Sequence, residues 1–347
     1  MRKTIRVILL ILLAVIVLAG GLIVYVKAAL PNVGSPQNLA VQLSAGRIAR
    51  GEYLANHVAA CMDCHSQRDW RFYAGPAKPG TFGAGGEKFG KEIGFPGALY
   101  SSNITPYGIG SWTDGELFRA ITTGVNKEGK ALFPLMDYHS YGRMDPEDIM
   151  SIIAYIRTLP AIKSEIPARQ LDFPLNLLVN TFPSRANPEK IPDSNNIMAY
   201  GRYHTTMADC IECHSKVNKG ARVEGSEFGG GRTFDFPNGT AVTSANITPD
   251  KETGIGLWDR SLFLKKFRQY ADSSYQPKPT GPNDFNTTMP WLAYSKMREK
   301  DLAAIYAYLR TVKPLHNAVK TFSRAPIPSS SLSSALKRQP DRFLPKG

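Results

Sequence analysis

Hydrophobic residues are most concentrated at the N-terminus, where residues 7–26 form an uncharged run. Three basic residues, Arg2, Lys3 and Arg6, precede this run. A helix rises about 1.5 Å per residue, so the run matches a bilayer core of about 30 Å, whereas the apolar region of a cleaved signal sequence is shorter. Basic residues on the N-terminal side keep that end in the cytoplasm. The pattern predicts a membrane anchor at 1–27, with a cleaved signal as the alternative, and in both cases the rest of the chain is exported.

The body of the chain shows apolar residues at helical spacing in two further places. Pro146 opens one helix after Asp145, and Pro314 follows the end of the other. The apolar positions of these helices are Ile149, Ile152, Ile153 and Ile156, and Leu302, Ile305, Tyr306 and Leu309. Residues 46–60 and 197–209 are also predicted to be helical. Strand signals are weak, and the chain has 30 Gly and 25 Pro residues, so we predict a mainly α fold that is rich in loops.

An internal repeat divides the body into two similar copies. Gly51-Glu52-Tyr53 in the first copy corresponds to Gly201-Arg202-Tyr203 in the second, and each copy then contains an Asn-Ile-Thr-Pro tetrapeptide and a Gly-Ile-Gly followed by Trp. Four further landmarks recur at identical spacing: Met136, Tyr141, Met144 and Arg157 in the first copy, and Met289, Tyr294, Met297 and Arg310 in the second. The period is much longer than that of a solenoid, which indicates duplicated domains.

These patterns predict how the chain is divided. The anchor at 1–27 is followed by a linker at 28–45, a first domain at 46–160, a Pro-rich linker at 161–195, a second domain at 196–316 and a basic Ser/Pro-rich tail at 317–347. Residues 171–182 of the second linker are apolar but too short to span a bilayer. We expect them to pack between the domains or to contact the membrane surface. The net charge of +13 lies largely in the anchor and the tail, which gives no support for a nucleic-acid partner.

All four cysteines belong to two identical motifs. Cys61-Met62-Asp63-Cys64-His65 and Cys210-Ile211-Glu212-Cys213-His214 leave no thiol for a disulfide framework or an all-cysteine zinc site. CxxCH is the signature of covalent haem attachment, in which the two thiols form thioethers to the porphyrin and the imidazole binds the iron. For a CxxC alone, a redox-active dithiol is the alternative. The sequence therefore predicts two covalent haem c groups, held by Cys61, Cys64 and His65 and by Cys210, Cys213 and His214.

The second axial ligand of each iron decides between electron transfer and catalysis. A Met thioether raises the reduction potential, whereas an open position permits chemistry at the metal. Met136 and Met289 lie in loop sequence near prolines, and we predict that they are these ligands. Met144 and Met297 come just before the last helix of each copy, where Met commonly fills a core. These two residues, and His139 in the first copy only, remain the alternatives.

The two halves resemble class I cytochrome c domains. Over residues 46–316, the CxxCH, Asn-Ile-Thr-Pro and Gly-Ile-Gly-x-Trp motifs, the Met near a Pro and the closing Ala-Tyr-(Ile/Leu)-Arg helix resemble the multi-haem cytochrome c subunits of membrane-bound alcohol and gluconate dehydrogenases. The resemblance implies two tandem class I cytochrome c domains in which the motif Met is the axial ligand. Two features depart from it: those subunits usually carry three haems, and Asp137 follows Met136 where Pro is preferred.

The resemblance also implies particular contacts around each haem. The first and last helices of each copy are expected to cross where a Gly meets an aromatic residue, at Gly51 with Tyr155 and at Gly201 with Tyr308. Four side chains are candidate haem contacts, with turn formation or loop packing as the alternative role: Asn103, Trp112, Asn246 and Trp258.

These observations favour a membrane-anchored dihaem cytochrome c without substrate chemistry of its own. It would relay electrons from a dehydrogenase or a quinol-oxidising complex to a soluble cytochrome or a terminal oxidase, with its haem domains on the periplasmic side of the inner membrane. A dihaem cytochrome c peroxidase is the alternative, because such enzymes also have two CxxCH domains. His57, His204 and His316 are expected to be ordinary surface or capping residues.

Overall fold

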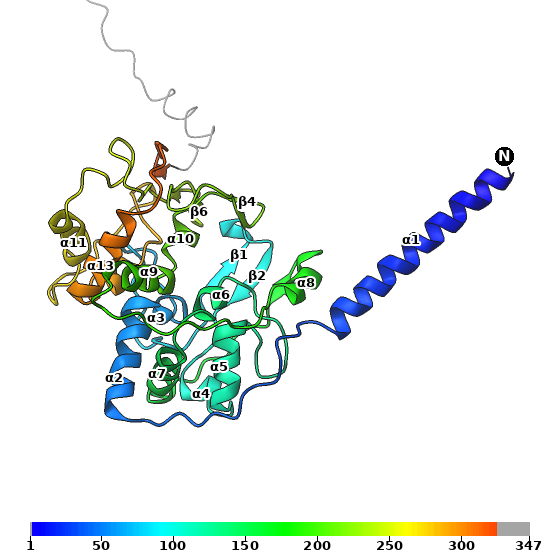
Figure 1. The fold of residues 1–347 in the computed structure, drawn as a ribbon, viewed down its shortest axis with the longest axis horizontal. Coiled ribbons are helices and arrows are strands. Elements are labelled where there is room, and N and C mark those ends of the chain that lie inside the picture. Colours follow the sequence, from blue (N-terminus) through cyan, green and yellow to red (C-terminus); the bar gives the residue numbers. More distant parts are fainter. Residues whose placement is uncertain (1, 325–347) are drawn as a thin grey trace, which may run out of the picture.

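The computed structural model describes residues 2–324 of the chain. Its first element, α1 (Arg2–Ala28), projects away from the folded body (Figure 1) and has no buried residue. The helix is long and apolar enough to cross a membrane, with a mean hydropathy of 3.4 over its most apolar window. The predicted apolar helix at the N-terminus is therefore present. Most of the predicted basic tail, residues 325–347, lies outside the described part of the chain.

The first copy of the repeat consists of short helices and two short strands. Its elements are α2 (Ala45–Tyr53), a π-helical turn (Leu54–Val58), α3 (Cys61–Cys64), β1 (Lys88–Gly90), a 3-10 turn (Lys91–Ile93), β2 (Gly97–Tyr100), α4 (Pro106–Ile109), α5 (Asp114–Thr123), α6 (Tyr138–Tyr141) and α7 (Pro146–Arg157). The predicted helix start at Asp145 is confirmed, because its side chain accepts a hydrogen bond from Glu147 N. Thr113 and Glu116 form a reciprocal capping box at the start of α5.

The predicted linker and the second copy continue the same pattern. Their elements are β3 (Gln170–Leu171), α8 (Leu175–Leu178), a 3-10 turn (Val179–Thr181), α9 (Ile197–Met207), α10 (Cys210–Cys213), β4 (Val217–Asn218), β5 (Ala221–Arg222), β6 (Thr233–Asp235), β7 (Ala241–Thr243), α11 (Arg260–Arg268), α12 (Trp291–Tyr294), α13 (Glu299–Leu309) and β8 (Phe322–Ser323). The structure is helix-rich, as predicted, and each predicted helix is present.

The first and last helices of each copy cross at a glycine. A Cβ added to Gly51 would lie 1.7 Å from the carbonyl oxygen of Ser151 and 2.9 Å from Tyr155 Cβ. A Cβ on Gly201 would lie 2.0 Å from the carbonyl oxygen of Ala304 and 3.0 Å from Tyr308 Cβ. The predicted contacts of Gly51 and Gly201 are confirmed. At both crossings the absence of a side chain lets two helix backbones touch.

Besides the two-stranded β4-β5 hairpin, the described residues form two three-stranded antiparallel sheets that were not predicted from the sequence. One has the order β1-β2-β3 and the other β6-β7-β8, so each copy contributes a hairpin and a later segment supplies the third strand. The third strand of the second sheet, β8, lies within the predicted tail. These strands are two to four residues long, which is too short for an alternating pattern to be recognised.

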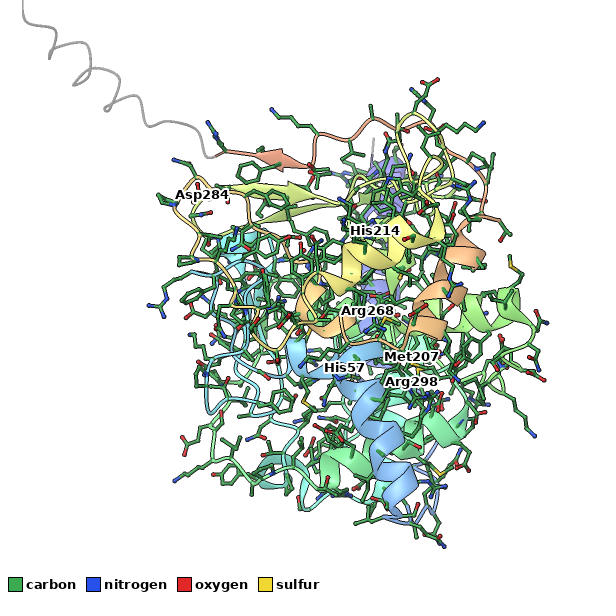
Figure 2. All side chains as sticks on the ribbon, turned by 90° about the vertical axis from the view of Figure 1, so that its left-hand side faces the viewer. His57, Met207, His214, Arg268, Asp284 and Arg298 are labelled. Atoms are coloured by element: carbon green, nitrogen blue, oxygen red, sulfur yellow. The ribbon has the colours of Figure 1, made fainter. Side chains whose placement is uncertain are left out.

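Reciprocal hydrogen bonds join the two copies. Tyr53 Oη donates to the carboxyl group of Asp301 at 2.5 Å, and Tyr203 Oη donates to that of Asp148 at 2.8 Å. Tyr53 and Tyr203 occupy the same position in the repeat, as do the two aspartates, so each copy contributes one donor and one acceptor. Arg298 lies over the ring of Tyr53 at this junction, near His57 (Figure 2). The junction is therefore polar, buried and specific in its pairing.

The three histidines outside the CxxCH motifs that were expected at the surface or at helix caps differ in burial. His204 is fully buried, with Nδ1 3.0 Å from the carbonyl oxygen of Tyr200 and Nε2 3.7 Å from Asp301. The expectation that it lies on the surface was wrong, because α13 covers this face of α9. Burial lowers the pKa of His204, which favours the neutral imidazole. His57 is partly buried, whereas His316 is exposed near Asp250 and Glu252, as expected.

Replacing Tyr53 by Phe is expected to lower the free energy of unfolding by about 2 kcal/mol, because the buried carboxyl group of Asp301 loses a hydrogen-bond donor. Urea unfolding of the full chain in detergent measures this change. Tyr107→Phe, at an exposed position, is the matched control and is expected to have almost no effect. Equal stability of the two variants would show that the Tyr53 bond does not hold the copies together.

Candidate functional site

Both CxxCH motifs adopt the same local structure. Each pair of cysteines occupies one helical turn, α3 or α10, and the residue before each turn has a left-handed backbone: Ala60 at φ 48° and Asp209 at φ 53°. This conformation is uncommon for a residue other than glycine, and its recurrence shows that both motifs are held in one geometry. It follows the end of the preceding helix and turns the chain, and in each motif both cysteines and the histidine line a cavity.

The two motif histidines each have one nitrogen fixed by the backbone. His65 Nδ1 lies 2.7 Å from the carbonyl oxygen of Ser102, and His214 Nδ1 lies 2.7 Å from that of Ala245. A carbonyl can only accept, so Nδ1 carries the hydrogen and Nε2 keeps a free lone pair. Desolvation lowers the pKa of the His65 and His214 imidazoles, which also favours the neutral form. This is the tautomer that a metal-ligating histidine needs.

The cysteines are not poised for thiol redox chemistry. Desolvation raises the pKa of Cys61 to about 12, that of Cys64 to about 11 and that of Cys210 to about 12, and it raises the pKa of Cys213 as well. A redox-active CxxC depends instead on a thiol with a lowered pKa. The four thiols are free in this structure. These environments argue against the dithiol alternative.

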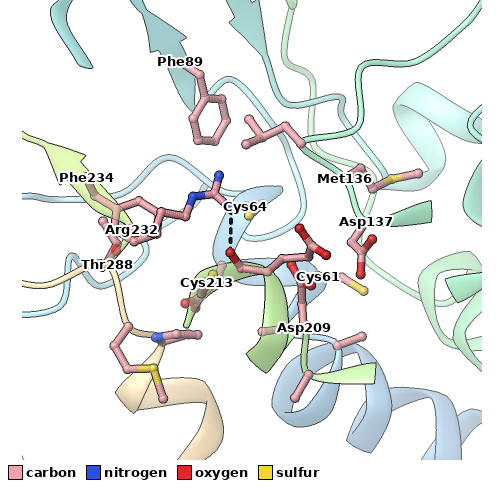
Figure 3. A pocket seen from close by; sticks show the side chains of 18 of the residues that line it. Cys61, Cys64, Phe89, Met136, Asp137, Asp209, Cys213, Arg232, Phe234 and Thr288 are labelled. Carbon is pink, nitrogen blue, oxygen red and sulfur yellow. Dashed lines mark hydrogen bonds between the residues drawn. The ribbon is translucent and has the colours of Figure 1, made fainter. Parts of the chain in front are cut away.

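One cavity of about 2630 Å³ receives both motifs. Pockets for a single drug-sized ligand typically measure about 300 to 1,000 Å³, so this cavity has room for more than one large group. Cys61, Cys64 and Cys213 lie around it together with Met136 (Figure 3). Among residues 2–324, no group of three or more His, Cys, Asp or Glu side chains could hold a metal ion. The thiols and imidazoles of both motifs line this cavity, and these are the groups that attach and ligate a haem.

The predicted axial methionines line this cavity from equivalent loops. Met136 and Met289 are partly buried, and the carbonyl oxygen of each accepts a 2.7 Å hydrogen bond from the backbone nitrogen two residues later. Met144 and Met297 are 2% and 1% exposed, belong to the hydrophobic core, and do not line the cavity. His139 does line it, but the residue is exposed and its Nδ1 lies 3.1 Å from Ser184 Oγ.

The four candidate haem contacts also line the cavity. The asparagines have a clear structural role as well, because Asn103 Oδ1 accepts from Thr105 N at 2.9 Å and Asn246 Oδ1 accepts from Thr248 N at 2.9 Å. These bonds stabilise the two Asn-Ile-Thr-Pro turns, which lie beside the cavity. Trp112 and Trp258 are partly buried against the core, so that part of each indole faces the cavity.

A pair of acidic residues at this site was missed from the sequence. The side chains of Asp137 and Asp209 lie next to each other beside Cys61 (Figure 3), and each keeps one buried carboxyl oxygen without a hydrogen-bond partner. Burial, followed by the neighbouring Asp137, raises the pKa of Asp209 well above its ordinary value. The repeat gave no signal for this pair, because the residue that corresponds to Asp209 in the first copy is Ala60.

Two free imidazole nitrogens and four thiols around one large cavity are features of a c-type cytochrome. No protein-family model matches the chain. Among curated proteins, it is 30% identical to the fructose dehydrogenase cytochrome subunit of Gluconobacter japonicus over 86% of this chain, and 28% identical to the cytochrome c subunit of a quinone alcohol dehydrogenase of Gluconacetobacter polyoxogenes over 83%. It is also 27% identical to a dihaem c-type cytochrome of Cereibacter sphaeroides over 77% of this chain.

The resemblance inferred from the motifs is thus confirmed. Homologues of this chain are cytochrome c subunits of fructose, alcohol and gluconate dehydrogenases and a dihaem cytochrome c, at 26–30% identity over most of its length. They imply covalently bound haem c and a role in electron transfer. The chain spans 60% of the length of the fructose and alcohol dehydrogenase subunits, and 86% of the length of the dihaem cytochrome.

Proposed function

We propose that the chain is a membrane-anchored dihaem cytochrome c that relays electrons. The observation that carries this proposal is the placement of both CxxCH turns, both motif histidines and both loop methionines on the walls of one cavity. Residues 46–160 and 196–316 would then be two class I cytochrome c domains, each with one haem. The repeat of the Gly-to-backbone helix crossing in each copy supports this division.

The chain's own residues would hold each haem in a defined place. Cys61 and Cys64, and Cys210 and Cys213, would form the thioethers, while Ser102 and Ala245 keep the two imidazoles oriented through their carbonyl oxygens. The bound haem supplies an iron that alternates between two oxidation states. The thioethers of Met136 and Met289 would favour the reduced state, and the apolar walls of the cavity would exclude water from the site.

The same arrangement favours a relay over a peroxidase. A peroxidase needs a vacant or displaceable axial position at one haem, whereas here both copies present a methionine from an equivalent loop. The shared cavity also brings the two sites together, which suits transfer of an electron from one haem to the other without any substrate between them.

The apolar N-terminal helix and the relatives support a proposed location and proposed partners. Apolar α1 would hold the protein in the inner membrane with its body on the periplasmic side. The relatives named as dehydrogenase cytochrome subunits support a dehydrogenase as the electron donor. A quinol-oxidising complex is a second donor, and a soluble cytochrome or a terminal oxidase would be the acceptor.

Replacing Met136 or Met289 by Ala is expected to lower the potential of one haem in each variant, by on the order of 0.1 V, because axial ligands set haem potentials over a range of about 0.8 V. An optical redox titration of the full chain measures both potentials. Met144→Leu, a change of similar volume in the core, is the control and is expected to leave both potentials nearly unchanged. Unaltered potentials in both alanine variants would contradict the ligand assignment.

A further inference from the structure

We propose that residues 173–178, which include α8, form a second membrane contact that inserts into the bilayer surface beside α1. The inference rests on the proposed function in one respect, that α1 is a membrane anchor. It names the lipid interface as the partner of an exposed apolar segment, and it fixes how the folded body would sit on the membrane.

The segment lies beside the point where α1 leaves the membrane. In Figure 1, α8 is on the side of the body that faces α1. Both α8 and the 3-10 turn that follows it contact α1, and Asn180 Nδ2 lies 3.5 Å from the carbonyl oxygen of Val26. The body therefore touches the anchor here.

The depth of this contact follows from the sequence of α1. Val26 is the last residue of the uncharged run, and Lys27 comes directly after it. At a rise of about 1.5 Å per residue, Val26 lies about 3 Å before the helix end at Ala28. A lysine at the end of a spanning helix lies at the headgroup level. The contact between Asn180 and Val26 therefore places this segment at the boundary between headgroups and acyl chains.

The exposed side chains of the segment suit that boundary. Phe173 is 78% exposed and Leu178 is 46% exposed, and Pro174 between them is also exposed. On the other side, Val179 is 1% exposed and fixes the segment to the body. An apolar face about 5 to 10 Å deep in the headgroup region is how interfacial segments bind.

The segment is packed against the folded body and is not a free loop. Just before it, β3 pairs with β2, with Gln170 opposite Ala98. Asp172 forms a 2.9 Å ion pair with Lys91. Leu175 and Phe182 line the haem cavity. The membrane contact would thus hold the first copy of the repeat, and this wall of the cavity, against the bilayer.

Site-directed nitroxide labelling of the full chain in lipid nanodiscs tests the proposal. In the haem-loaded protein the four native cysteines are thioethers, so an introduced cysteine is the only free thiol, and the parent protein shows the background. The test positions are Phe173→Cys in the segment, Leu18→Cys in α1 and Leu257→Cys beside α11. Leu257 is the matched control, because it is 75% exposed and comes shortly before α11 (Arg260–Arg268), which lies across the body from α1 in Figure 1.

The readout compares how often the attached nitroxide collides with oxygen and with a polar nickel complex. Oxygen is concentrated in lipid and the nickel complex in water, so a high oxygen-to-nickel ratio of collision rates marks a lipid environment. We expect this ratio to be severalfold higher at positions 173 and 18 than at position 257. A water-like ratio at 173 with a lipid-like ratio at 18 would overturn the second contact and leave the anchor in place. A water-like ratio at 18 would overturn the anchor itself, and with it the proposed attachment to the membrane.

Discussion

A chain that carries serine at both Cys61 and Cys64 is expected to retain one covalent haem instead of two. Serine cannot form a thioether, and each motif has its own pair of thiols on a separate helical turn. The mirror variant, with serine at Cys210 and Cys213, is expected to give the same content, and the fourfold variant none. The mass of the denatured chain, together with the pyridine haemochrome absorbance per chain, measures the covalent content directly.

The two double variants serve as controls for each other. Each leaves the opposite motif and its histidine unchanged, so the haem that remains reports on the native site. A chain that keeps two haem masses after either double change would contradict the assignment of one haem to each motif. Loss of both haems in each double variant would contradict the independence of the two attachment turns.

Alanine at Gly51 is expected to lower the free energy of unfolding by about 3 kcal/mol. The added Cβ would lie 1.7 Å from the carbonyl oxygen of Ser151, so α2 and α7 would have to move apart. Overpacking of a close contact typically costs about 1 to 3 kcal/mol and occasionally more. The higher helix propensity of Ala, worth about 1 kcal/mol, does not offset a backbone clash of this kind.

Gly46 provides the matched control, because it lies in the same helix and a Cβ there would meet nothing within 4 Å. Gly46→Ala is expected to be neutral or slightly stabilising. Chemical unfolding of the two variants and the parent chain, followed by far-ultraviolet circular dichroism, gives the comparison. Equal stability of Gly46→Ala and Gly51→Ala would show that the helix crossing does not depend on the glycine.

Features with a local or repeated signal could be predicted from the sequence. The helix starting after Asp145 carries its own capping residue and apolar spacing, and the crossings at Gly51 and Gly201 recur in both copies. The cavity position of Met136 was also expected, because a loop residue with a repeat partner was preferred over Met144 in the core.

Features that depend on contacts between distant segments could not be predicted. His204 is buried because Asp301 and the rest of α13 cover it, and a single helix pattern does not show which face another helix will cover. Asp137 and Asp209 meet only when the two copies come together, and Asp209 has no acidic counterpart in the repeat. Strands as short as β3 are defined by the partner they pair with, not by their own sequence.

The position of the 171–182 segment is another feature that could not be predicted, because it depends on a contact with a distant part of the chain. Its apolar composition left open whether it packs between domains or contacts a membrane. The structure adds the contact of Asn180 with Val26, which places the segment beside the apolar helix. Only the fold could bring together two segments that are so far apart in the sequence.

The central claim is that each chain holds two haems with His and Met ligands and uses them only to pass electrons. The measurement that tests it most directly is the far-red spectrum of the fully oxidised, full-length protein with its haem content quantified, before and after addition of peroxide. The account predicts a Met-to-iron charge-transfer band from both haems and no reaction with peroxide. A high-spin fraction that reacts with peroxide would contradict it.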